Sequence, residues 1–297
     1  MLRAQLYLHF SIFLWGFTGI FGKAISLNEG MLVWYRMGLT ALIWLLVLRL
    51  TRRLRWLGWI TTLHLVGIGV VLTLHWLFFY ASIKHGNISV AMSCLAFVAV
   101  FSSLLEPLLL RRPLEWVQVA LAVLALFGML LIFQFTASAR LGIALGLISA
   151  FLGSLFTILN KRMANQQDSE HITAYEIGSG FLFLSLLLPV YLDYMESPWL
   201  WPSQTDGLLL LLFVVFCTVV PFNLAIKSLK HVSAFTANLS LNLEPVYGIL
   251  LAMLIYREHR QLGPGFYVGM SLVLVSVMAY GWYRWIRLKQ SASVAPT

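Results

Sequence analysis

The chain has 297 residues, of which 60% are hydrophobic and 10% charged, and it carries a formal net charge of +9. Soluble globular proteins usually hold about a quarter charged residues, so this supply could hardly cover a water-exposed surface. Apolar runs of about 20 residues, long enough to cross a bilayer core, recur along the whole sequence. The composition therefore predicts a polytopic protein of a lipid bilayer and argues against a soluble enzyme or binding domain.

The basic residues do not gather on one soluble segment. They stand in short clusters between apolar runs, as in residues 49–55 and 111–112. This pattern is typical of membrane anchors and topology signals, and we expect no nucleic-acid partner. Cys94 and Cys217 lie in apolar runs far apart in the sequence, so no disulfide framework is expected.

Ten apolar segments are predicted to form transmembrane helices, because an open sheet could not satisfy its backbone in lipid. The first segment contains Trp15 and Lys23 and is followed by further spans, so we expect it to be retained rather than cleaved as a signal peptide. The predicted helices cover residues 6–26, 31–50, 59–82, 88–110, 115–134, 141–161, 171–192, 207–228, 233–255 and 263–284.

Lysines and arginines set the expected orientation of these helices. With the N-terminus inside, 14 of the basic residues fall on the inner side of the membrane and 6 on the outer side. Positively charged loops favour the cytoplasm. We therefore predict a multi-pass protein of the cell (cytoplasmic or inner) membrane with both termini in the cytoplasm.

The two halves of the chain are similar to each other. Three pairs of segments align in the same order: "SIFLWGFTGIFGK" (11–23) with "SAFLGSLFTILNK" (149–161), "YRMG" (35–38) with "YEIG" (175–178), and "SIKHGNISVAM" (82–92) with "SLKHVSAFTAN" (228–238). Each half holds five predicted helices, an odd number, so the second half should enter the membrane from the opposite side. An inverted repeat is a common architecture of secondary transporters, whose binding site lies near the membrane midplane between the halves.

The predicted fold is therefore all-α and integral to the membrane, with ten transmembrane helices arranged as two inverted five-helix repeats. We place the first repeat at residues 1–135 and the second at 141–289. Residues 290–297 are predicted to form a short cytoplasmic tail.

Three motifs carry a resemblance to a known family. The first helix contains "LWG" (14–16), the second contains "YR" (35–36), and the ninth ends in "LEPVYGILLAMLIYRE" (243–258). Together with ten helices in two halves, these motifs make the chain resemble the EamA-type branch of the drug/metabolite transporter superfamily. The resemblance covers nearly the whole sequence.

The resemblance implies an exporter or exchanger of small metabolites whose central cavity opens alternately to each side. It also implies that the substrate touches helices one, three, four, six, eight and nine. The first half departs from the family pattern, because Ala99 and Arg112 stand where Pro245 and Glu258 would have their partners. The proline and the loop acid are therefore present only once.

The ninth predicted helix carries polar side chains in an otherwise apolar run. Glu244 is a carboxylate within the membrane, which costs several kcal/mol unless it is paired or solvated, and such residues are usually functional. We expect Glu244 to recognise the substrate or to carry a coupling proton; the alternative is a protonated side chain that bonds to a neighbouring helix. Thr236 and Ser240 share a helical face with Glu244, while Asn238 and Asn242 form a second stripe.

Two prolines are expected to shape the cavity. Pro245 removes an N–H group and its ring clashes one turn back, so carbonyl groups near Leu241 would be freed. Those carbonyls could bind an ammonium group of the substrate, or the kink could act on the cavity shape alone. Pro221, in the eighth predicted helix, is expected to kink that helix in the same way.

Arg36 and Glu176 occupy equivalent places in the repeat with opposite charges. For Arg36 two interpretations stay open: it pairs with Glu29 seven residues earlier, or it lies at the outer mouth of the cavity and binds a carboxylate of the substrate. Glu176 lies near Lys161 and Arg162 in the predicted topology. Pairing at the surface is the simpler interpretation for both residues.

Aromatic residues make up 14% of the chain, and several lie deep in the predicted helices. Trp15, Trp76 and Tyr80 belong to this set, and His75 stands beside Trp76. These residues either pack helices together or form an aromatic-walled pocket in which His75 supplies a hydrogen bond.

The sequence contains no sign of an enzyme. The seven histidines show no metal-ligand spacing, and we find no phosphate-binding loop, dinucleotide motif or nucleophile elbow. We therefore expect no catalytic residues, no metal and no cofactor, and no direct use of ATP.

The sequence as a whole predicts a secondary transporter with alternating access that exports or exchanges small amphipathic metabolites, amino acids or related compounds first among them. Its partners would be a small-molecule substrate, the lipid bilayer and a coupling proton, in a monomer or a homodimer. A nucleotide-sugar or phosphorylated-sugar carrier is an alternative, which would need several cations in the cavity, and the candidates are Lys23, Arg36 and Lys161. A second alternative is an intramembrane enzyme or lipid-handling factor, which would need a paired acid–base or metal constellation.

Overall fold

A computed structural model describes residues 2–110, 116–135, 139–164, 166–194, 196, 201–229, 240 and 243–293, and the regular elements in these residues are helices. The first half contains α1 (Leu2–Gly16), α2 (Thr18–Ala24), α3 (Glu29–Leu50), α4 (Trp59–His85), α5 (Ile88–Leu95), α6 (Phe97–Leu110) and α7 (Trp116–Phe135). The second half contains α8 (Arg140–Ala164), α9 (Ser169–Tyr194), α10 (Gln204–Val214), the π-helix η2 (Val215–Val219), α11 (Val220–Leu229), α13 (Leu243–Tyr256), the 3-10 helix η3 (Glu258–Arg260) and α14 (Pro264–Ser293).

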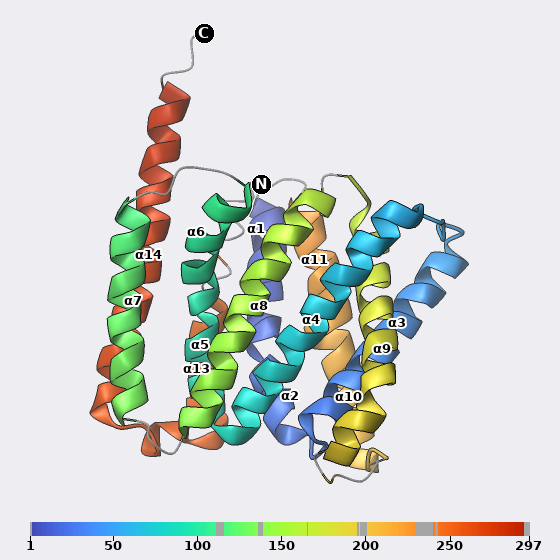
Figure 1. The fold of residues 1–297 in the computed structure, drawn as a ribbon, viewed down its shortest axis with the longest axis horizontal. Helices are drawn as coiled ribbons and strands as arrows, with labels where there is room; N and C mark the ends of the chain where they lie inside the picture. Colours follow the sequence, from blue (N-terminus) through green and yellow to red (C-terminus); the bar gives the residue numbers. More distant parts are fainter. Residues whose placement is uncertain are drawn as a thin grey trace.

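The helices run roughly along one direction, and α1 begins at the same end of the molecule at which α14 finishes (Figure 1). We call this the terminal end. The opposite, distal end holds the connections at residues 25–28 and 86–87 together with η3. α8 begins at the distal end, so the two halves of the chain start from opposite ends (Figure 1).

Seven of the described helical segments are long and apolar enough to cross a membrane. Three shorter apolar segments, Ile88–Ser102, Val123–Ile132 and Leu243–Tyr256, fall in the remaining predicted spans. Each of the ten predicted spans thus contains at least one described helix, and the prediction of a multi-pass helical membrane protein is confirmed. The count of ten crossings stays a prediction.

Three spans predicted as single helices are interrupted. The first is divided at Phe17 into α1 and α2, and the fourth is divided at Ala96 into α5 and α6. In the eighth, the π-helix η2 separates α10 from α11 and ends two residues before Pro221. Proline lacks an N–H group, and its ring crowds the carbonyl four residues back, here that of Cys217. The π-helix η2 has a wider turn than an α-helix, and this wider turn makes room for the proline ring.

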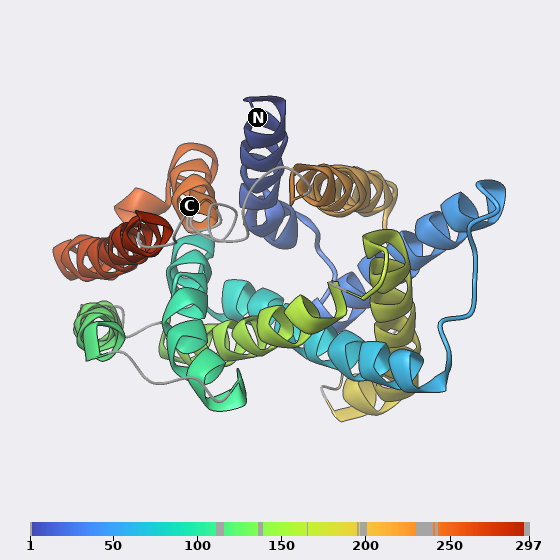
Figure 2. The ribbon, with the colours of Figure 1, turned by 90° about the horizontal axis from the view of Figure 1, so that it is seen from above.

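Small residues let the helices approach closely, as is usual for helices packed in a membrane. A Cβ atom at Gly146 of α8 would lie 2.8 Å from the Ser82 Oγ of α4, and one at Gly69 of α4 would overlap the Glu176 carbonyl oxygen of α9. α4 therefore packs directly against both α8 and α9, and α9 in turn packs against α3. α1 packs on α11 and α13 on the other side of the molecule (Figure 2).

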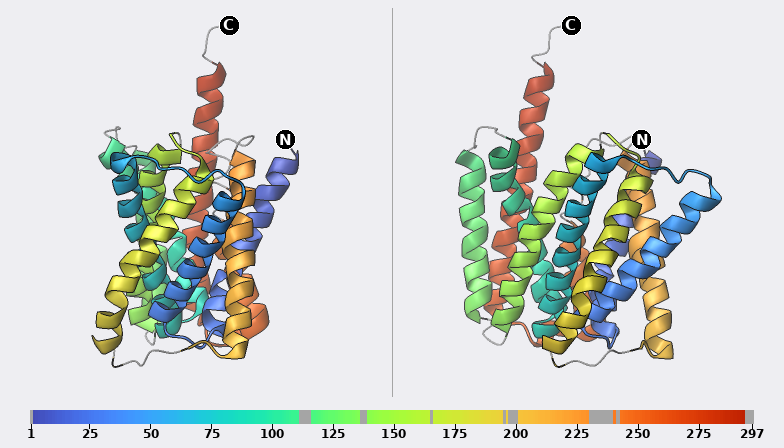
Figure 3. Two further views of the ribbon diagram at one scale, coloured as in Figure 1. Left: turned by 90° about the vertical axis from the view of Figure 1, so that its right-hand side faces the viewer. Right: turned by 45° about the vertical axis from the view of Figure 1, so that its right-hand side comes forward.

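α7 and α14 form a pair at one side of the molecule, and α14 extends beyond the other helices at the terminal end (Figure 3). Gly128 of α7 faces Gly269 of α14, and a Cβ atom on either glycine would collide with the carbonyl oxygen of the other. The two backbones are therefore in direct contact.

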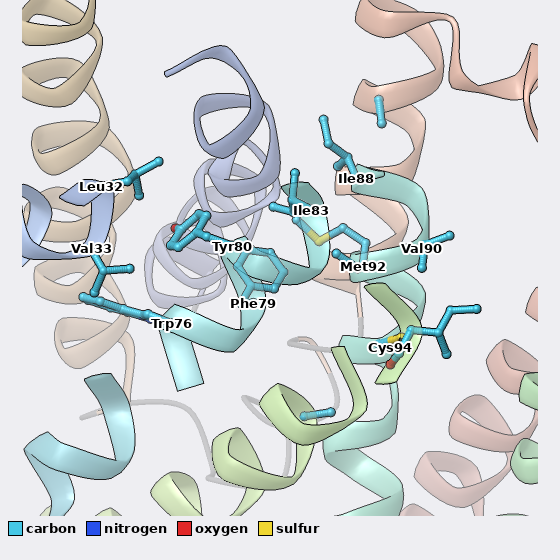
Figure 4. Packing of buried hydrophobic residues seen from close by; sticks show 14 of the residues in the cluster. Leu32, Val33, Trp76, Phe79, Tyr80, Ile83, Ile88, Val90, Met92 and Cys94 are labelled. Carbon is cyan, nitrogen blue, oxygen red and sulfur yellow. Dashed lines mark hydrogen bonds between the residues drawn. The ribbon is translucent and has the colours of Figure 1, made fainter. Parts of the chain in front are cut away.

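The main apolar core draws on helices of both halves of the chain, and α3, α4 and α5 contribute a large share of it. Figure 4 shows part of it, in which side chains from these three helices interlock. Its fully or almost fully buried members include Leu32, Val33, Trp76, Phe79, Tyr80, Ile83, Ile88, Val90, Met92 and Cys94. This core fixes the backbone of α3 and α4 where they carry the charged and aromatic residues described next.

Candidate functional site: a buried arginine in an aromatic cage

α3 carries Arg36 into the interior of the protein, where 2% of its surface is exposed. Its Nε donates to Thr218 Oγ1 at 3.1 Å, and its Nη1 donates to Tyr80 Oη at 2.6 Å. Of the two interpretations of Arg36, pairing with Glu29 is wrong: Arg36 bonds to Tyr80 and Thr218, and Glu29 instead accepts a hydrogen bond from Tyr191 at 2.6 Å. None of the ion pairs between described residues includes Arg36.

Aromatic rings surround the Arg36 guanidinium. Its central carbon lies 3.7 Å from the Trp76 ring centroid, 4.4 Å from that of Phe213 and 5.9 Å from that of Tyr80. Cation–π contacts of this kind contribute about 2 kcal/mol each when desolvated, which partly offsets the burial of the charge. We call Trp76, Tyr80, Phe213 and Thr218 the guanidinium cage; Figure 4 shows the two members from α4.

The π-helix η2 supplies the polar wall of the cage. Thr218 lies in η2 and is fully buried, and its neighbour Cys217 donates to the Leu14 carbonyl oxygen at 3.3 Å. π-helical turns occur often at functional sites, because they re-aim side chains that a regular helix would place elsewhere. Here the turn contacts α3 through Thr218 and α1 through Cys217.

Glu244 contributes the negative charge nearest to this site. It lies in the first turn of α13 and keeps part of its surface exposed. It interacts electrostatically with Arg36 and Tyr80 without belonging to an ion pair with them. A cation from the first half of the chain and a carboxylate from the second half therefore act on the same region, separated by more than direct contact.

Arg36 retains hydrogen-bonding capacity. A guanidinium has five N–H donors in a fixed planar fork. Two of them donate to described side chains, those of Tyr80 and Thr218. The geometry of such a fork matches a carboxylate or phosphate bidentately, so an anionic group is the natural ligand for the other donors.

The other predicted site residues of the ninth span are placed at or before the start of α13, or lie outside the described residues. Ser240 is 9% exposed and lies just before α13. Thr236, Asn238 and Asn242 lie outside the described residues. Pro245 is buried in the first turn of α13, a position at which helices tolerate proline.

His75 and Trp15 lie in contacts between helices rather than in the cage. His75 Nδ1 is 2.8 Å from the Ser149 carbonyl oxygen and 3.0 Å from Ser149 Oγ, so this side chain joins α4 to α8. Trp15 makes an edge-to-face contact with Phe222, with ring centroids 5.6 Å apart, between α1 and α11. The structure thus brings Arg36 together with Trp76 and Tyr80, and both Glu244 and His75 interact electrostatically with Arg36, whereas Trp15 packs between α1 and α11.

Polar contacts tie the helices together at the distal end. Glu258 of η3 is fully buried, and it accepts from Lys23 Nζ at 2.9 Å, from the backbone N–H groups of Ile88 at 3.2 Å and Ser89 at 2.8 Å, and from Ser89 Oγ at 2.8 Å. We call these residues the distal tie. It joins α2, the start of α5 and η3, and so links both halves of the chain.

Two further contacts strengthen the same end. Asp206 of α10 accepts from the Ser26 backbone N–H at 2.8 Å and from Ser26 Oγ at 2.6 Å. Lys84 Nζ donates to the Ile25 carbonyl oxygen at 2.7 Å. The distal part of the first span, α2, therefore packs against α4, α5, α10 and α13, whereas the main contacts of α1 are with α11, α13 and η2.

Within the described part of the chain, no group of three or more His, Cys, Asp or Glu side chains is placed to hold a metal ion.

Apolar membrane-spanning helices around a buried charged site define a polytopic membrane protein of the transporter type. The model of the EamA-like transporter family matches this chain twice, at residues 2–134 and 140–282. The chain therefore belongs to the EamA-like transporter family, and the resemblance of its motifs to that family is confirmed.

A solved structure titled "Crystal structure of protein" is similar over 93% of this chain and 96% of that chain, with a TM-score of 0.63 and 16% sequence identity. At this identity the likeness is one of fold alone. The comparison with curated proteins gave no match.

Two members of the cage, Phe213 and Thr218, are absent from the sequence-based site. Both lie in the apolar eighth span, and the spacing of residues does not reveal which spans are neighbours. The one signal in the sequence is a threonine three residues before Pro221, where a proline is expected to disturb the helix.

Proposed function

We propose that this protein is a secondary transporter that moves small zwitterionic metabolites, amino acids or related compounds, by alternating access. The observation that carries the proposal is the guanidinium of Arg36, which is buried without an ion-pair partner among the described residues while Glu244 lies within electrostatic reach. A buried charge left unpaired is strongly unfavourable, by several kcal/mol. An anionic substrate group would supply the missing partner.

The two charges suit the two ends of a zwitterion. The carboxylate of an amino acid would bind the free N–H groups of Arg36, and its ammonium group would approach Glu244. The aromatic cage around Arg36 supplies an apolar surface for an amphipathic side chain. Because Arg36 is 2% exposed, the substrate would reach it through a rearrangement of the helices, as alternating access requires.

The arrangement of the helices supports the same proposal. α1 and α8 start from opposite ends of the molecule, which is expected for two inverted repeats (Figure 1). With both termini in the cytoplasm, the distal tie would close the outer side of the membrane. Direction of transport, as export or exchange, belongs to the proposal and follows the resemblance to the family.

The carrier of nucleotide sugars or phosphorylated sugars is less well supported. Such substrates need several cations in the cavity, and Lys23 is engaged by Glu258 in the distal tie. Arg36 is then the described cation best placed for a central substrate.

Counterflow in proteoliposomes with a panel of labelled amino acids tests the proposal. We expect exchange by the wild type, and a loss of roughly 30-fold or more in Arg36→Lys, because a lysine keeps the charge but loses the fork and about 2 kcal/mol of directed bonding. Arg53→Lys is the matched control, because Arg53 is half exposed at the terminal end, and it should exchange like the wild type.

Glu244→Gln separates the two ends of the substrate. It should weaken exchange of amino acids more than exchange of the corresponding carboxylic acids that lack the amino group. If no member of the panel exchanges in the wild type, or if Arg36→Lys exchanges normally, the proposed function is wrong.

A further inference from the structure

α9 carries a second buried ionisable residue, Glu176, at the place in the second repeat that corresponds to Arg36 in the first. It exposes 3% of its surface. Its Oε2 accepts from Asn160 Nδ2 of α8 at 3.0 Å, while its Oε1 is buried and has no hydrogen-bond partner in the described part of the chain. The predicted surface position of Glu176 is therefore wrong.

The part of α9 that carries Glu176 packs closely against α4 and α8. Ile172, one turn earlier on α9, belongs to a buried cluster with Leu65 and Ile68 of α4 and Met163 of α8. At Gly69 the backbones of α4 and α9 touch, because a Cβ atom there would overlap the Glu176 carbonyl oxygen. An ionised carboxylate with one unpartnered oxygen is strongly disfavoured in such a place, whereas a protonated carboxyl is much less so.

None of the described charged groups on the surrounding helices neutralises Glu176. On α9, His171 bonds through Nε2 to the Arg53 carbonyl oxygen at 2.7 Å and Glu170 pairs with Arg53. None of the described charged groups of α3, α4, α8 or α9, His64 and Arg36 included, interacts electrostatically with the Glu176 carboxyl, and the side chains of Lys161 and Arg162 lie outside the described set. A bound proton would neutralise the Glu176 carboxylate in place of a charged side chain.

We propose that Glu176 is the proton-binding site that couples transport to a proton gradient. The carboxyl takes a proton from water on Oε1 when the helices open to one side and returns it to water as the carboxylate forms on the other side. Asn160 donates to Oε2 in both states. This inference rests on the proposed function and names its coupling site.

Coupling follows from the packing. When Glu176 is protonated, α4, α8 and α9 can close around it as the structure shows. When it is ionised, the charge needs water, and water can enter only where these helices separate. A group that favours one of two conformations by its charge shifts their populations by that difference in free energy.

Infrared difference spectroscopy of the purified, substrate-free protein tests the proton site without any transport. Raising the pH should remove a carbonyl-stretch band of a protonated, buried carboxyl. This band should be absent from Glu176→Gln and should persist in Glu244→Gln. Should Glu176→Gln fail to fold, Asn160→Leu must shift the same band, because it removes the N–H that Oε2 accepts.

The transport arm compares accumulation driven by a pH gradient with counterflow in the same proteoliposomes. The ratio of the two should fall at least tenfold in Glu176→Gln and stay unchanged in Glu170→Gln, which carries the same substitution at a partly exposed position of α9. A band that survives in Glu176→Gln, a band unmoved by Asn160→Leu, or an unchanged ratio overturns the proton site. Failure of all amino acids to exchange in the wild type refutes the proposed function instead, while the infrared result still decides whether Glu176 binds a proton.

Discussion

Replacing Glu258 with glutamine should loosen the distal end of the protein. The carboxylate is fully buried and accepts from Lys23, from two backbone N–H groups and from the Ser89 hydroxyl. Glutamine has nearly the same shape but keeps only one acceptor oxygen, and its NH2 group would face donors. The substitution therefore removes the charge and at least two of the four contacts without emptying the site.

The size of the effect follows from these contacts. Hydrogen bonds to a charged group contribute about 1.5–3 kcal/mol each. The ion pair adds less, because Lys23 is 34% exposed and solvent screens it. Losing two charge-assisted bonds should favour opening of the distal end by about 3 kcal/mol. Since each 1.4 kcal/mol is a factor of ten, the open population should rise roughly 100-fold.

Maleimide labelling in nanodiscs measures this opening. Ile25 is fully buried at the distal end, so a cysteine placed there reacts only when that end opens. The native Cys94 and Cys217, both buried, are first replaced by alanine. We expect Ile25→Cys to react roughly 100-fold faster when Glu258→Gln is added, in line with the shift in population.

Glu170→Gln is the matched control for this measurement. Glu170 pairs with Arg53 at the terminal end, where the two side chains are 30% and 49% exposed. Such a pair contributes at most about 1 kcal/mol, so labelling of Ile25→Cys should change little. Equal labelling rates in the Glu258 and Glu170 variants, with both proteins folded, would refute the role given to the distal tie.

Three further changes test the packing and the site. Gly69→Ala should lower the free energy of unfolding by about 2 kcal/mol or more, because the added methyl group collides with α9. Gly67→Ala on the same helix meets no atom within 4 Å and should be neutral or slightly stabilising. Thermal unfolding measures both, and equal losses of stability would contradict the close approach of α4 and α9. Tyr80→Phe removes one hydrogen bond to Arg36 and should weaken substrate binding about fivefold, for a bond of about 1 kcal/mol, and unchanged binding would argue against substrate contact with the cage. Asp206→Asn should raise distal-end labelling less than Glu258→Gln. Apart from bonds with Ser203 at the cap of α10, the described hydrogen bonds of Asp206 come from Ser26. A larger rise than in Glu258→Gln would reverse the ranking of the two contacts.

The membrane class and the approximate spans are predictable from the sequence, because hydrocarbon demands long apolar helices whatever their neighbours. The interruptions are not. Phe17 divides the first span where Gly16 comes against Tyr247 of α13, with a Cβ position 2.8 Å from the Tyr247 Cβ. Such a contact joins residues far apart in the sequence, so composition and periodicity carry no record of it.

The candidate site shows the same division. A charged residue within a span predicts function, and both Arg36 and Glu244 are found that way. Their partners depend on which helices are neighbours: Glu29 bonds to Tyr191 of α9, and Arg36 bonds to Thr218 of η2. For Glu176, the repeat indicates the position but gives no measure of burial, which the contact of α4 with α9 creates.

The direct backbone contact of α7 with α14 has a consequence for biosynthesis. Gly128 of α7 enters the membrane early, while its partner Gly269 lies on α14, which leaves the ribosome only after α8 to α13. Until then the small-residue face of α7 has only lipid to pack against. The nascent first half therefore lacks one of its packing partners, and insertion of α14 is the step that completes the contact surface of α7.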